Sequence, residues 1–154
     1  MVDVSNPTRH KLLLIDCNIS FLYQQFTTEM TTSTHATEYT LIYACPEKLN
    51  KNFNLQNIIK LASKIDSYCF GLLALYILLD GIHPLFMCLP EDIGQQDKSD
   101  VKEMQENFNL EESLEQVKDV IWDSEMGKQY KQLLQDSLQY NHANRKTIKD
   151  IYNS

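Results

Sequence analysis

Glycine is scarce in this chain, with four residues among 154. Loops that hold phosphate groups need closely spaced glycines, because only glycine adopts positive φ freely and lets the backbone approach the ligand. The sequence has no Gly-x-Gly-x-x-Gly motif and no Gly-x-x-x-x-Gly-Lys motif. It also has no Gly-x-Ser-x-Gly and no His-Glu-x-x-His. These 154 residues therefore contain no recognisable nucleotide-phosphate loop and no common hydrolase signature.

Cysteine is equally scarce, and its spacing does not fit a metal site. Cys17, Cys45, Cys69 and Cys88 stand 28, 24 and 19 residues apart, and no Cys-x-x-Cys pair occurs. A structural zinc usually takes four ligands in closely spaced pairs. We therefore expect reduced, mostly buried thiols, which suit a cytoplasmic protein.

Long apolar runs are missing as well. The longest, Cys69 to Leu79, has eleven residues, whereas a membrane-spanning helix needs about 20. Met1 to Pro7 shows no basic segment followed by an apolar one, so no secretory signal is expected. These absences predict a buried core helix and no membrane contact.

Positive charge is in deficit, with 14 basic against 21 acidic residues and a net charge of −7. This balance offers no electrostatic reason to bind nucleic acid or anionic membranes. The stretch from Glu91 to Glu125 contains twelve acidic residues and three lysines. A solvated helix face or loop is the favoured interpretation of this stretch, and an acidic docking segment the alternative.

The residues that are present predict a mainly α protein. Apolar residues make up 43% of the chain, enough for a globular core. Short apolar runs separated by turn residues predict a small β-hairpin over 2–16. Beyond Pro46 the apolar spacing becomes helical, and we expect five or six helices. They include an amphipathic stretch at 55–62, a helix at 66–79 that is apolar all round, and a last short helix from about Thr147.

Four short motifs occur in an order typical of one family. They are Leu-Ile-Asp-Cys-Asn at 14–18, Thr-Leu-Ile-Tyr-Ala-Cys-Pro-Glu at 40–47, Asp-Ser-Tyr-Cys-Phe-Gly at 66–71 and Asn-Arg-Lys-Thr at 144–147. Each motif alone is weak, but together they resemble the rear part of the C-terminal lobe of eukaryotic-type protein kinases. The resemblance spans nearly the whole chain. It implies a hairpin over 2–16, an activation-segment-like part over 16–47 and a helical subdomain over 48–154.

The resemblance also implies roles for individual residues. Asp16 takes the position of a magnesium ligand, although a carboxylate that merely caps a turn is the favoured interpretation. Glu47 and Arg145 match a buried ion pair that ties the activation segment to the last helices. Asp66 matches a carboxylate at the start of the central helix. The remaining structural positions are Tyr43, Pro46 and Gly71.

Other kinase elements are missing from these residues, among them the His-Arg-Asp catalytic loop and the strand lysine. We therefore expect a non-catalytic, kinase-derived interaction module that needs no cofactor. The alternative is the C-terminal part of a Ser/Thr-type kinase whose ATP-binding lobe and catalytic loop are supplied by another chain or lost by truncation. ATP and magnesium would then bind only where the missing lobe completes the site. In a whole kinase, further helices surround the 66–79 helix. Without them one flank, including Phe70, Leu73, Leu75, Ile77 and Leu78, should need a protein partner or a second copy.

Overall fold

The computed structural model describes residues 2–3, 11–12, 41–50, 55–88, 97–118 and 120–153. The chain divides into two compact units, Met1–Glu38 and Tyr39–Ser154. In the first unit, strand β1 (Val2–Asp3) pairs antiparallel with strand β2 (Lys11–Leu12), with Val2 opposite Leu12. The rest of the expected hairpin, including Asp16, lies outside the described residues, so the hairpin stays a prediction.

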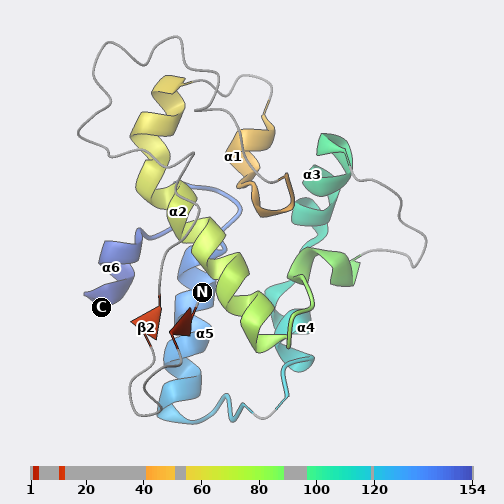
Figure 1. Ribbon diagram of the computed structural model, residues 1–154, viewed down its shortest axis with the longest axis vertical. Helices are drawn as coiled ribbons and strands as arrows, with labels where there is room; N and C mark the ends of the chain where they lie inside the picture. Colours follow the sequence, from red (N-terminus) through yellow and green to blue (C-terminus); the bar gives the residue numbers. More distant parts are fainter. Residues whose placement is uncertain are drawn as a thin grey trace. The chain divides into compact units, whose positions relative to one another are not determined.

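The described part of the second unit is helical, which confirms the mainly α class. Its elements are η5 (Leu41–Tyr43), α1 (Pro46–Leu49), α2 (Leu55–Leu78), η6 (Pro84–Cys88), α3 (Lys98–Asn107), α4 (Leu110–Glu115), α5 (Glu125–Ser137) and α6 (Ile148–Tyr152). Helix α2 packs against α5, α6 and η6, while α3 packs against α1, η5 and η6 (Figure 1).

Short polar side chains explain where several helices begin. The Asp97 side chain accepts hydrogen bonds from backbone N–H groups in the first turn of α3, and the Asp100 carboxylate accepts one from the Asp97 N–H. Thr147 and Asp150 form the same reciprocal capping box at the start of α6. Such boxes satisfy backbone N–H groups that have no partner within the helix. The expected helix start near Thr147 is confirmed.

Helix α2 joins two stretches that their apolar patterns predict as separate helices. The segments 55–62 and 66–78 lie in one helix of 24 residues, because the intervening Ser63, Lys64 and Ile65 do not interrupt it. Asp66 therefore lies inside a helix and not at its start, which corrects the position that the resemblance implied.

Burial of α2 is one-sided, although its C-terminal half is apolar all round. Five residues face the core, and at about 100° per residue they fall within roughly 80° around the helix axis. They are Ile65, Tyr68, Leu72, Leu75 and Leu79. On the opposite side Phe70, Leu73 and Ile77 are exposed. Leu75, which was expected to lie on a flank without cover, is buried instead.

Two other apolar patterns predicted burial that the fold does not provide. The spacing of Leu110, Leu114, Val117 and Ile121 is typical of one amphipathic helix, but α4 ends at Glu115 and the Ile121 side chain is exposed. In α6, the apolar spacing of Ile148, Ile151 and Tyr152 predicts an inward face, yet Ile148 and Tyr152 are exposed. Apolar periodicity therefore shows neither where a helix ends nor which neighbours cover its side chains.

Candidate functional site

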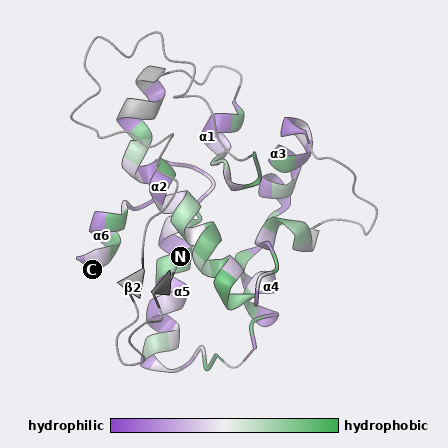
Figure 2. Cartoon of the chain, viewed as in Figure 1, coloured by the Kyte–Doolittle hydropathy of each residue, from purple (hydrophilic) through white to green (hydrophobic). Residues whose placement is uncertain are grey.

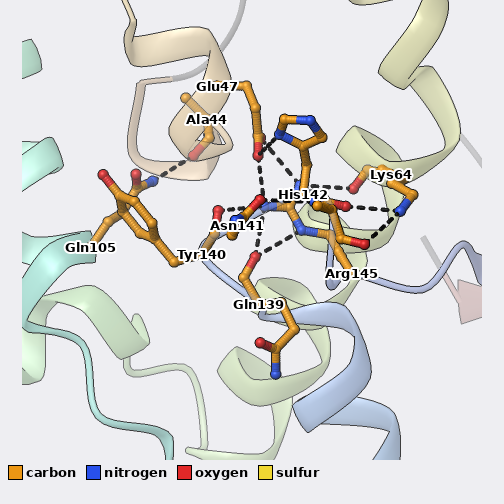
Figure 3. A network of polar contacts seen from close by, with 10 residues as sticks. Ala44, Glu47, Lys64, Gln105, Gln139, Tyr140, Asn141, His142 and Arg145 are labelled. Carbon is orange, nitrogen blue, oxygen red and sulfur yellow. Dashed lines mark hydrogen bonds and ion pairs between the residues drawn. The ribbon is translucent and has the colours of Figure 1, made fainter.

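Arg145 is the most completely buried charged residue among those described. It precedes α6, and its side chain has no exposed surface. Its Nη1 donates to Glu47 Oε2 at 3.2 Å, and its Nη2 donates to Glu47 Oε1 at 3.1 Å (Figure 3). The planar guanidinium thus meets the carboxylate in a bidentate arrangement, the geometry in which arginine binds carboxylates best. Glu47 is 10% exposed.

Backbone carbonyl groups occupy the remaining donors of Arg145. Nε and Nη2 donate to the carbonyl of Gln139 at 2.9 and 2.7 Å, and Nη2 also reaches the carbonyl of Tyr140. Nη1 donates to the carbonyl of Lys64 in α2 at 3.1 Å. A buried guanidinium is tolerated only when its charge and its N–H groups are satisfied in this way. Since these donors are occupied, Arg145 links segments of the chain and is not available to a ligand.

Lys64 and His142 extend this network toward the surface. Lys64 Nζ donates to the His142 carbonyl at 2.8 Å, and His142 Nδ1 lies 3.4 Å from Glu47 Oε1. Glu47 itself sits in the first turn of α1, where a carboxylate is favoured by the helix dipole. The network therefore joins α1, α2 and the loop before α6 through side chains that are distant in sequence.

Tyr43 and His83 form an aromatic contact that sequence reasoning missed. Their rings meet edge to face, with centroids 4.8 Å apart, and Tyr76 and Phe86 lie around the same histidine. His83 Nδ1 accepts a hydrogen bond from the Leu85 N–H at 3.3 Å, whereas Nε2 has no partner among the described residues. Burial lowers the pKa of His83 from 6.5 to about 4. The imidazole is therefore neutral at physiological pH.

Two thiols lie near the ion pair without being reactive. Burial raises the pKa of Cys45 to about 12 and that of Cys69 to about 11. Cys69 Sγ donates to the carbonyl of Tyr43 at 3.2 Å. Only the thiolate is a good nucleophile, so neither cysteine is suited to covalent catalysis at neutral pH.

The other residues predicted to be structural occupy distinct places. Pro46 is the first residue of α1, where its missing N–H costs no hydrogen bond. Gly71 is buried where α2 meets the end of α5, and a Cβ at this position would overlap Ser137 Oγ. Asp66 is exposed on α2, and partial desolvation raises the pKa of its carboxyl group. Lys48 partly offsets this shift.

A cavity of about 270 Å³ lies beside the loop that follows α5. Tyr68, Phe108 and Leu138 supply apolar walls, and Gln105 lines it from α3. Gln105 Nε2 donates to the carbonyl of Ala44 at 2.6 Å (Figure 3), which connects α3 to the segment before α1. The described residues contain no group of three or more metal-ligating side chains, and Asp16 lies outside them.

The exposed side of α2 carries an apolar stripe, formed by Phe70, Leu73 and Ile77. These side chains are 40%, 45% and 65% exposed. Figure 2 shows the C-terminal half of α2 in the colours of hydrophobic residues. By length and composition Lys60–Leu78 could also span a membrane, with a mean hydropathy of 1.4. A core helix passes the same test, and Leu72 on this helix is fully buried.

Comparison with known proteins identified no relatives. No protein-family model matches the chain, no curated protein matches it, and no solved structure matches it.

Proposed function

We propose that the chain is a non-catalytic interaction module built like the rear part of a protein kinase C-terminal lobe. The bidentate contact between Glu47 and Arg145 supports this architecture, because the same two residues carry the family's ion pair in the resemblance. The pair connects the helix that begins at Pro46 with the loop that leads into α6. No cofactor is needed for such a role, and a cytoplasmic location suits the reduced thiols.

The apolar stripe on α2 is the observation that carries the interaction role. Phe70, Leu73 and Ile77 fall within roughly 60° around the helix axis, since successive residues are about 100° apart. Isolated apolar residues on a surface are ordinary, but a row of three large ones on one helix marks a surface that a partner or a second copy covers. The opposite side of the same helix already forms the core, so α2 cannot bury both sides within the described part of the chain.

A matched pair of variants tests this role. Leu73→Ser with Ile77→Ser removes most of the stripe, and Ile121→Ser changes an equally exposed isoleucine outside it. We expect the unaltered chain either to associate beyond 18.0 kDa in light scattering or to bind a hydrophobic dye. The double variant should lose that behaviour and the control should keep it. A stable 18.0 kDa monomer that binds no dye would contradict the proposal.

A further inference from the structure

An aspartate stands at each end of the apolar stripe. At about 100° per residue, Asp66 lies on the same side of α2 as Phe70, Leu73 and Ile77, and Asp80 follows the last turn. Both aspartates are exposed. With a rise of about 1.5 Å per residue, they are separated by roughly 20 Å along the helix. The surface therefore has an uncharged apolar middle and a carboxylate at either end.

The end near Asp80 carries the stronger unmet negative potential. The carbonyl end of a helix bears partial negative charge, and α2 has no basic residue in its last turn. Among the described residues, Asp80 takes part in none of the ion pairs. At the other end, burial raises the pKa of the Asp66 carboxyl group, and the nearby Lys48 offsets part of this rise. A basic side chain of a partner would therefore be stabilised most if it lay beside Asp80.

A second copy of the chain fits this surface poorly. Parallel packing of two stripes would place like aspartates together. Antiparallel packing would place Asp66 of one copy opposite Asp80 of the other, and Lys48 offsets the charge of Asp66 only in part. Like charges that face each other across an interface select against that pairing. The net charge of −7 on each copy adds to the repulsion. Charge complementarity thus favours a different occupant.

We propose that the apolar stripe binds an amphipathic helix of another protein, with a lysine or arginine of that helix packed beside Asp80. This inference rests on the proposed interaction role and names its partner. A helix with apolar residues at i, i+3 and i+7 presents a row that matches Phe70, Leu73 and Ile77 in spacing. A basic residue at its end would neutralise Asp80 and the carbonyl end of α2 together.

Two synthetic peptides serve as probes. Both are helices of about five turns with leucine at i, i+3 and i+7. One carries lysine at both ends, and the other carries glutamate at the same places. In fluorescence anisotropy with the whole chain at low salt, the lysine peptide should bind at least about tenfold more tightly than the glutamate peptide. The ratio should shrink at high salt because screening weakens exposed charges.

Substitution of Asp80 tests the charge directly. Asp80 has a φ of 53°, and asparagine tolerates this left-handed region well, so Asp80→Asn keeps the backbone. The variant should bring the ratio of the two affinities several-fold closer to one. Asp123→Asn, an exposed aspartate in the segment before α5, is the control and should leave the ratio unchanged. Ile77→Ser should weaken the binding of both peptides.

The outcomes separate this inference from the proposed function. Equal binding of both peptides, weakened by Ile77→Ser, would overturn the basic partner and leave the interaction role intact. If the chain forms a dimer that Ile77→Ser dissociates, and binds neither peptide, the basic partner is also overturned. The occupant of the stripe would then be a second copy of the chain. A monomer that binds neither peptide nor hydrophobic dye would overturn both.

Discussion

The guanidinium carbon of Arg145 lies 4.7 Å from the centre of the Tyr68 ring, so an aromatic side chain of α2 covers the buried cation. Glu47 approaches the edge of the same guanidinium from α1. A cation over an aromatic ring gains about 0.5–2 kcal/mol, more when water is excluded. Because the burial of Arg145 is complete, these contacts must replace all the hydration that it loses.

Removal of one member of the ion pair should destabilise the chain strongly. Arg145→Leu leaves the Glu47 carboxylate without its partner and deprives the carbonyls of Lys64, Gln139 and Tyr140 of a donor. We expect a loss of about 3–5 kcal/mol in the free energy of unfolding, measured by urea denaturation. Lys102→Ala breaks an exposed pair with Glu106 and should cost no more than about 0.5 kcal/mol.

The double variant Glu47→Leu with Arg145→Leu isolates the charge. It should be more stable than the sum of the single changes predicts, because no unpaired carboxylate remains. Recovery should be partial, since the three carbonyls still lack their donor. Small, additive losses would instead mean that the two charges act independently.

The ion pair shows what short motifs in a single sequence can reveal. Glu47 and Arg145 are 98 residues apart, and no local pattern connects them. Only the order of the motifs suggested that they meet. Thr147 was predictable for a different reason, since a capping threonine followed by an acid is a local signal.

Other features depended on contacts that the sequence does not encode locally. The apolar residues of α2 are spread around the whole helix, so periodicity could not show which side is covered. His83 contacts Tyr43 of η5 and Phe86 of η6, and these two elements are far apart in the sequence. The Gln105 bond to the Ala44 carbonyl is likewise long-range and carries no motif.

Gly71 should not tolerate a methyl group. A Cβ there would overlap Ser137 Oγ and lie 2.8 Å from Leu138 Cγ. Alanine improves helix propensity by up to about 1 kcal/mol, but overpacking costs about 1–3 kcal/mol. We expect Gly71→Ala to lower stability on balance in thermal or urea denaturation. Ser63→Ala, on the exposed side of the same helix, should be neutral or slightly stabilising.

A second substitution checks the cause of that loss. Ser137→Ala removes the hydroxyl that the new methyl group would meet, although it also loses a bond to the Leu134 carbonyl. Gly71→Ala combined with Ser137→Ala should therefore be more stable than additivity predicts. Strict additivity would show that the glycine is not required by this contact.

Purified chain should bind Mg-ATP no more tightly than about millimolar, which corresponds to about −4 kcal/mol. The 154 residues contain no phosphate loop and no catalytic His-Arg-Asp motif. Isothermal titration is the measurement, with transfer of labelled phosphate as a second readout. A micromolar constant that disappears in Asp16→Ala would favour the alternative of a retained kinase site.

His83 should make the chain less stable in mild acid. Its pKa is about 4 in the folded chain against 6.5 in an unfolded one. Above pH 6.5 both states are neutral, and the histidine contributes no pH dependence. Between pH 6.5 and 4 the unfolded chain binds more protons, so the free energy of unfolding falls as the pH falls. The full loss, reached below pH 4, is about 3–4 kcal/mol, since each pKa unit is worth about 1.4 kcal/mol.

The test compares the unaltered chain with His83→Gln by urea denaturation from pH 7.5 down to about pH 4.5, which covers most of the titration of an unfolded histidine. Carboxylates titrate in both proteins, so the difference between the two stability profiles reports His83 alone. The variant loses the Nδ1 acceptor of the Leu85 N–H and should be less stable at pH 7.5. The difference in free energy of unfolding between the two proteins should shrink as the pH falls, because glutamine takes up no proton. Parallel profiles for the unaltered chain and His83→Gln would contradict this prediction. They would mean that His83 takes up its proton over the same pH range in the folded and unfolded chains, so that its surroundings admit water.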